Sequence, residues 1–188
     1  TLIYPLMMYW QIRLIAVAFC LIFAIINFLG VGHAGKLQIA LVLGLIAIIS
    51  FYIAKGLPLV NLEHFQSFMR GTSRDLFATA GLIFISYGGL TKIASVAEEV
   101  KNPARNIPLG MLTSFFVVST LYIATVFVTV GVLGDGLIEA PGQPSLTPIS
   151  DCAHIFMGRW GEVLLAVGAI LAFVSTGNAG IMAASRTP

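Results

Sequence analysis

The chain has 188 residues, of which 58% are hydrophobic and only 10% are charged, and its formal net charge is +2. A soluble domain typically carries about 25% charged residues, so this composition excludes an ordinary soluble protein and predicts an all-α integral membrane protein surrounded by lipid. The small net charge gives no reason to expect a nucleic-acid partner.

Five apolar stretches are long enough to be transmembrane helices, each of which needs about 20 residues to cross roughly 30 Å of hydrocarbon. A lead-in with Tyr4, Tyr9 and Trp10 precedes the first, and such aromatic residues favour the membrane interface. The two cysteines, Cys20 and Cys152, lack metal-ligand spacing, so we expect neither a metal site nor a disulfide between them. The predicted spans cover residues 12–31, 37–54, 76–97, 109–133 and 163–184.

Two connections on the N-terminal side are predicted to lie outside the membrane. Residues 30–36 are rich in glycine but lack the GK[ST] ending of a phosphate-binding loop, so we expect a plain loop with a solvated His33. Within residues 55–75 the apolar side chains recur at helical spacing. This pattern predicts a short helix along the membrane surface, on which His64 would be solvated.

A second surface helix is predicted in the connection before the last span. Thr147 can cap a helix and Pro148 suits its first position, while Gly158 is a suitable terminator. The expected helix therefore covers residues 148–157. It carries His154, for which the sequence shows no partner motif nearby.

The third span loses its helical character at two adjacent glycines, Gly88 and Gly89. Each glycine lowers helix propensity by about 1 kcal/mol relative to alanine. Irregular backbone at membrane depth persists only where it is buried in protein or lines a cavity, and broken helices mark the binding sites of transporters. Polar groups at such depth by default suggest function, although a lysine can also reach the interface. Those around the break are Ser86, Tyr87, Thr91 and Lys92.

A charged segment bounded by proline follows the break. Glu98 and Glu99 end the third span, where acidic groups oppose the helix dipole, so helix stability alone does not explain them. We expect them to pair with Lys101, with Arg105 or with a basic group elsewhere in the full-length protein. A solvated charged turn is the alternative.

The last two spans carry further polar signals. Asn106 is predicted to cap the fourth span, with Pro108 in its first turn. The fifth span contains Ser175, Thr176 and Asn178 in its second half. These small and polar residues either permit close helix packing or line a path for substrate or ion.

These motifs resemble those of the amino acid–polyamine–organocation (APC) permease family. Residues 84–89 (FISYGG) and 97–108 (AEEVKNPARNIP) are similar to its sixth helix and the loop that follows, and the second motif is highly specific. Residues 178–186 are similar to its eighth helix, and residues 27–32 with 36–38 to its fourth-to-fifth connection. The resemblance covers essentially the whole chain, as helices four to eight of a leucine-transporter-type bundle of two inverted five-helix repeats.

The resemblance implies a role for each residue at the break. In the family, the unwound sixth helix offers main-chain carbonyls to the substrate's ammonium group; here these belong to Ile85 and Gly88, and unwinding frees such carbonyls. Tyr87 is similar to the aromatic gate and Ser86 to a small residue of the pocket wall. The implied sets are Phe84, Ile85, Ser86, Tyr87, Gly88 and Gly89 for substrate binding, Thr91, Lys92, Ser175, Thr176 and Asn178 for coupling or gating, and Glu98, Glu99, Lys101, Asn102 and Arg105 for the cytoplasmic loop motif.

The chain departs from the family at two positions related to ion coupling. Members often carry an acidic residue just after the helix-six glycine, where this chain has Leu90-Thr91-Lys92. Some proton-coupled members carry a lysine midway along helix five, where this chain has Leu43-Gly44-Leu45. No cofactor is predicted, the coupling ion (H+ or Na+) stays open, and Lys92 is a candidate for a fixed charge.

The sequence therefore predicts a secondary transporter of amino acids or related amines, working by alternating access around Gly88 and Gly89 as a multi-pass protein of the cytoplasmic membrane. Its expected partners are the substrate, lipid and the remaining helices of a full-length transporter, because both ends of the chain resemble cuts. A transporter-derived membrane sensor is the alternative. An intramembrane enzyme is less well supported, because the sequence has no HExxH motif, paired intramembrane carboxylates or catalytic Ser/His/Asp set.

Overall fold

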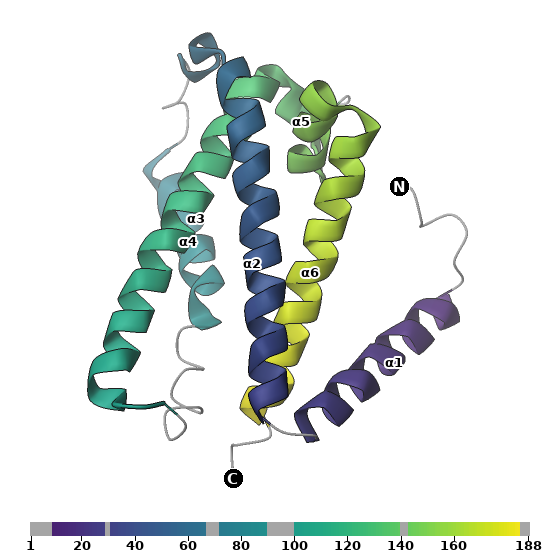
Figure 1. The fold of residues 1–188 in the computed structure, drawn as a ribbon. Coiled ribbons are helices and arrows are strands. Elements are labelled where there is room, and N and C mark those ends of the chain that lie inside the picture. Colours follow the sequence, from purple (N-terminus) through teal and green to yellow (C-terminus); the bar gives the residue numbers. More distant parts are fainter. Residues whose placement is uncertain (1–8, 29–30, 67–71, 90–99, 140–142, 185–188) are drawn as a thin grey trace. The chain divides into compact units, whose positions relative to one another are not determined.

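The computed structural model describes residues 9–28, 31–66, 72–89, 100–139 and 143–184. This part of the chain is built almost entirely of helices (Figure 1). A pair of two-residue antiparallel strands, β1 (Ile138–Glu139) and β2 (Gln143–Pro144), is its minor β component. The main helices are α1 (Tyr9–Phe28), α2 (Val31–Gly56), α3 (Ser73–Ser86), α4 (Pro103–Leu133), α5 (Pro148–Met157) and α6 (Arg159–Ala184).

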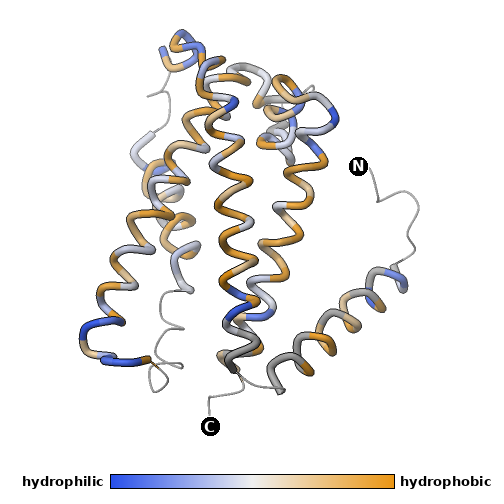
Figure 2. The backbone as a smooth tube through the Cα atoms, viewed as in Figure 1, coloured by the Kyte–Doolittle hydropathy of each residue, from blue (hydrophilic) through white to orange (hydrophobic). Residues whose placement is uncertain are grey.

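Three helices in the described ranges are long and apolar enough to cross a membrane: Gly35–Leu59, Pro103–Leu133 and Arg159–Ile181. Figure 2 shows hydrophobic residues along most of the length of α2, α4 and α6. The predicted spans 37–54, 109–133 and 163–184 lie within α2, α4 and α6 respectively. An α-helix satisfies its own backbone hydrogen bonds, which is why such apolar segments are helical in lipid.

The other two predicted spans differ from the helices that are found. The first, 12–31, overlaps α1, which begins three residues earlier and ends at Phe28. The third, 76–97, corresponds only in part to α3, which ends at Ser86, and residues 90–99 lie outside the described part of the chain. α3 as described has 14 residues, fewer than a membrane crossing requires.

Two expected helix starts are wrong. The glycine-rich residues 30–36 were expected to form a loop, but α2 begins at Val31 and includes His33. Gly32 and Gly35 are separated in the sequence, unlike the adjacent Gly88 and Gly89, and single glycines of this kind do not keep the segment out of the helix. Likewise α4 begins at Pro103 after an N-cap at Asn102, so Asn106 and Pro108 lie inside it. Proline favours the first helical position, and Pro103 occupies it.

The connection after α2 is also different from the expected single surface helix. It contains two short 3-10 turns, η1 (Leu57–Leu59) and η2 (Leu62–Phe65), while residues 67–71 lie outside the described part. Pro58 is in the first turn of η1. A proline there removes a hydrogen-bond donor, which favours ending α2 at Gly56 and beginning a new turn.

The chain falls into two units, one made of residues up to Gly44 and from Ile170 onward, the other of Leu45–Ala169. The core of the second unit is formed where α2, α4 and α5 meet. Tyr52, Val128 and Cys152 are fully buried there. Burial raises the pKa of the Cys152 thiol, which keeps it protonated and unreactive at neutral pH.

The buried hydroxyls of this core form a directed chain. The Thr129 hydroxyl donates to the Thr125 carbonyl oxygen at 2.7 Å, and it lies 2.8 Å from the Tyr52 hydroxyl. Because Thr129 has one proton to donate, the Tyr52 hydroxyl must be the donor to Thr129. α2 and α4 are thus joined by a fully satisfied hydrogen bond in the apolar core.

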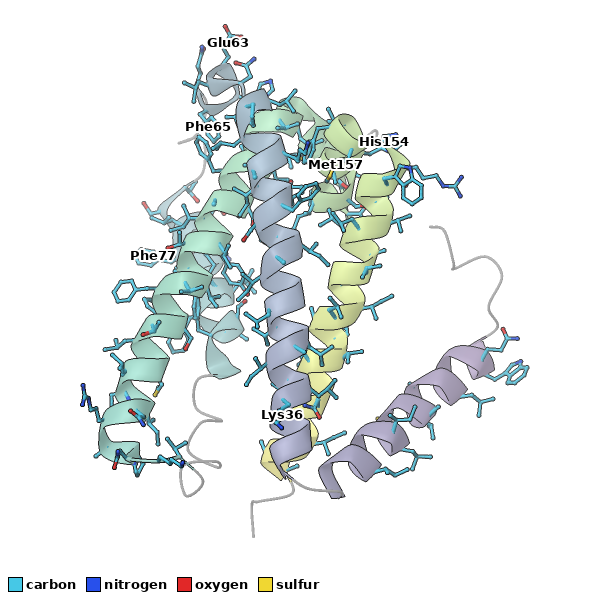
Figure 3. All side chains as sticks on the ribbon, in the orientation of Figure 1. Lys36, Glu63, Phe65, Phe77, His154 and Met157 are labelled. Carbon is cyan, nitrogen blue, oxygen red and sulfur yellow. The ribbon has the colours of Figure 1, made fainter. Side chains whose placement is uncertain are left out.

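His64 is exposed, as expected of a surface histidine, and it also bonds to the end of α4. Its Nδ1 lies 2.8 Å from the carbonyl oxygen of Gly131, and the Asn61 N–H donates to the same oxygen at 2.9 Å. A carbonyl oxygen only accepts, so Nδ1 carries the proton. Phe65 of η2, labelled in Figure 3, stacks on Phe127 with ring centroids 5.0 Å apart. The turn η2 is therefore held firmly against α4.

The predicted helix over residues 148–157 is confirmed. α5 covers Pro148–Met157, follows an N-cap at Thr147 and ends at Gly158, whose φ of 59° suits glycine. The sequence showed no partner motif near His154, but the structure gives this residue a partner. Its Nδ1 lies 2.8 Å from Oε1 of Glu162, so it joins α5 to the first turn of α6 (Figure 3).

Candidate functional site

The end of α3 forms the candidate site. α3 begins with a capping box in which Thr72 and Asp75 bond reciprocally, and these bonds lower the pKa of the Asp75 carboxyl. It ends at Ser86, after which Tyr87 forms a turn and Gly88 and Gly89 a 3-10 turn. The helix therefore stops directly before the two glycines, where their low helix propensity makes continuation least favourable.

A hollow of about 190 Å³ lies beside this helix end. Three of its lining residues come from the break and three from the middle of α4. It is open rather than enclosed, and of the lining residues that the structure describes none is charged. The lining residues are Ser86, Tyr87, Gly89, Ser114, Phe115 and Val118.

Tyr87 is the most firmly held side chain at this hollow. Its hydroxyl lies 2.7 Å from the Ser119 hydroxyl of α4. Its ring packs against Phe115, at 5.3 Å between centroids, and against Tyr122, at 6.0 Å and close to edge-on. Aromatic pairs at these separations are favourable, so the phenol is fixed both by ring contacts and by a hydrogen bond.

The two serine hydroxyls of the hollow are already used. Ser86 donates to the Leu82 carbonyl oxygen at 3.2 Å, and Ser114 donates to the Gly110 carbonyl oxygen. Each bond runs to the residue's own helix, four residues back. The hollow therefore offers mainly aromatic, apolar and main-chain surface to a ligand.

The structure places only some of the predicted substrate-binding residues at the hollow. Ser86, Tyr87 and Gly89 line it, whereas Phe84 is 80% and Ile85 72% exposed and neither is among the lining residues. The Tyr87 N–H donates to the carbonyl oxygens of Phe84 and Ile85. Any further donor at the Ile85 carbonyl oxygen would therefore use its second lone pair.

The predicted coupling and loop residues lie mostly elsewhere. Thr91, Lys92, Glu98 and Glu99 are outside the described residues, so the expected ion pairs of the two glutamates are outside as well. The rest of the loop motif begins α4. Asn102 has a left-handed φ of 51°, which asparagine tolerates, and its carbonyl accepts from the Arg105 and Asn106 N–H groups; the side chains of Lys101, Asn102 and Arg105 are exposed.

A second polar group joins α2 to α6 within the other unit. Gln38 Nε2 donates to the Ser175 hydroxyl at 2.7 Å, and Asn178 Nδ2 donates to Gln38 Oε1 at 3.0 Å. Asn178 is fully buried and Ser175 nearly so. Thr176 is exposed and donates to the Ala172 carbonyl of its own helix. Gln38 was not predicted as a site residue, and its signal was a polar amide in an otherwise apolar span.

We expect Asn178→Ala to lower the free energy of unfolding by about 1–2 kcal/mol, because it removes a buried donor and leaves the Gln38 amide oxygen without it. Denaturant unfolding of the full-length protein in detergent would measure the loss. Thr176→Ala is the matched control, since its hydroxyl serves only its own helix, and it should change stability by less than about 0.5 kcal/mol. Equal effects of the two substitutions would show that the amide pair does not join the helices.

The comparison with known proteins decides the family. The model of a family described as "Amino acid permease" matches residues 7–188. The chain belongs to the amino acid permease family. This confirms the resemblance found in the sequence motifs. With its long apolar helices, this family member is a multi-pass membrane protein of a permease family and not of an enzyme family.

Curated relatives agree with this assignment. The chain is 33% identical over 118 residues to the methylthioribose transporter of Bacillus subtilis, which covers 63% of the chain and 25% of that protein. It is 26% identical over 156 residues to the branched-chain amino acid permease BcaP of the same organism, and this match covers 82% of the chain and 33% of that protein. It is 26% identical over 172 residues to the inner membrane transport protein YbaT of Escherichia coli, and this match covers 92% of the chain and 39% of that protein. The chain thus spans between a quarter and two fifths of the length of these relatives.

Proposed function

We propose that the full-length permease containing this chain is a secondary transporter that carries an amino acid or a related amine by alternating access around the end of α3. The observation that supports this most directly is the end of the helix at Ser86, directly beside a hollow lined by Ser86, Tyr87 and Gly89. An interrupted helix in a membrane protein needs a protein or aqueous environment for its backbone, and a binding site supplies one.

The chemistry of the break suits a substrate with an ammonium group. Main-chain carbonyl dipoles at a helix end carry partial negative charge, which attracts a cation. The aromatic ring of Tyr87 lies at the same place, and an aromatic face also attracts an ammonium group. The relatives' names include a branched-chain amino acid permease and a cationic amino acid transporter of Arabidopsis thaliana, which supports an amino acid as the substrate class.

Uptake into liposomes tests this proposal. The purified full-length permease should accumulate at least one labelled amino acid or amine from a panel of leucine, arginine, alanine and putrescine, and imposed H+ or Na+ gradients should show which ion drives accumulation. Methylthioribose belongs in the panel because one relative is named for its transport. Protein-free liposomes give the background. Saturable binding of an amino acid without any uptake would contradict transport and favour the sensor, and uptake of methylthioribose alone would overturn the substrate class.

A further inference from the structure

Ser119 differs from the other hydroxyl residues around it on α4. Thr113, Ser114 and Thr120 each donate to the carbonyl of the residue four positions back in their own helix. Ser119 instead bonds to the Tyr87 hydroxyl, 32 residues away in the sequence, at 2.7 Å. Its side chain is half-buried and is not among the described residues that line the hollow, so its link to the hollow is the bond to Tyr87.

The position of the tyrosine ring depends on this bond. Phe115 and Tyr122 contact the ring of Tyr87, but contacts between ring faces and edges allow it to slide and tilt at little cost. A hydrogen bond is directional and fixes the hydroxyl at one point. Ser119 therefore supplies the restraint that the aromatic contacts lack, and the fixed ring forms one wall of the hollow.

We propose that Ser119 is a positioning residue for substrate selection: by holding the Tyr87 hydroxyl it sets the size of the side chain that the hollow accepts. This rests on the proposed function, since it concerns the same substrate site. The wall that it fixes is aromatic and is joined by Phe115 and Val118, with no charged residue among the described lining residues. The side chains selected by size are therefore apolar ones.

Kinetics of the full-length permease in liposomes test the proposal, with KM and kcat measured for leucine and alanine. Ser119→Ala should raise KM for leucine about fivefold relative to KM for alanine, as expected from the loss of one hydrogen bond, and should change kcat less than about twofold. Ser119→Thr keeps a hydroxyl and should restore the wild-type ratio. Thr120→Ala, one residue along on α4, is the matched control and should leave the ratio unchanged.

The partner substitution separates positioning from general packing. Tyr87→Phe removes the other half of the bond and should shift the ratio as Ser119→Ala does, and the double variant should show no further shift, because the two residues share one interaction. Additive effects, or a Ser119→Ala variant that is less stable but has an unchanged KM ratio, would overturn the proposal. Wild-type protein without amino acid uptake would overturn the proposed function itself, which is a separate result from the same assay.

Discussion

Replacing Gly88 and Gly89 together with alanine should reduce substrate uptake by the full-length permease about thirtyfold. Each replacement favours the helical conformation by about 1 kcal/mol, so the two together favour it by about 2 kcal/mol. A free-energy change of that size shifts the equilibrium between a broken and a continuous helix about thirtyfold. Among the described residues other than the immediate chain neighbours, an added Cβ atom would meet no atom within 4 Å at either position. The loss is therefore expected from the backbone and not from steric clash.

The control for this double variant lies in the same helix. Gly81 is in the interior of α3, and a Cβ there also meets no atom within 4 Å in the described part of the chain outside its own stretch of helix. Gly81→Ala should leave uptake unchanged and should raise the free energy of unfolding slightly, since it favours a helix that is already formed. Initial rates of labelled amino acid uptake, normalised to the amount of reconstituted protein, measure both variants. Wild-type rates in the double variant would show that transport does not need the helix to end at these glycines.

The second large effect is expected on stability, from Gly161→Ala. A Cβ at Gly161 would lie 2.6 Å from the carbonyl oxygen of Ala153 and 2.9 Å from Cβ of Met157. The nearest obstacle is the backbone of α5, which cannot rotate away as a side chain can, so α5 and the start of α6 must separate. Overpacking of this kind costs about 1–3 kcal/mol.

Denaturant or thermal unfolding of the full-length permease in detergent measures this loss. Gly180→Ala is the control in the same helix, because a Cβ there meets no described atom outside its own stretch of helix within 4 Å. It should be neutral or slightly stabilising. If Gly161→Ala were as stable as the control, the close contact between α5 and α6 would not exist in the protein.

Local signals in the sequence predicted the local features of the structure. The caps Thr147 and Gly158 delimited α5 correctly, and the paired glycines lie where α3 ends. The start of α4 was predicted wrongly because an asparagine cap followed by a proline occurs twice within a few residues. The prediction chose Asn106, whereas the helix is capped by Asn102. Composition and hydrophobic length were sufficient for the membrane class, since they depend on no long-range contact.

Pairing between distant residues could not be predicted. The sequence placed Tyr87 at the site, but its bond to Ser119 depends on which helices are neighbours and on their rotation about their axes. The same applies to Gln38 and Asn178, which are 140 residues apart. In a single sequence, a serine that holds a partner helix looks the same as one that bonds to its own backbone.

The two hydrogen bonds that the Gly131 carbonyl oxygen accepts restrict how α2 and α4 can move. The Asn61 N–H and Nδ1 of His64 make these bonds, and only η1 and Val60 separate Asn61 from the end of α2. A connection this short cannot lengthen. The end of α2 therefore cannot move away from α4 without breaking both hydrogen bonds. Within the unit Leu45–Ala169, the last turns of α2 and α4 are therefore expected to move together.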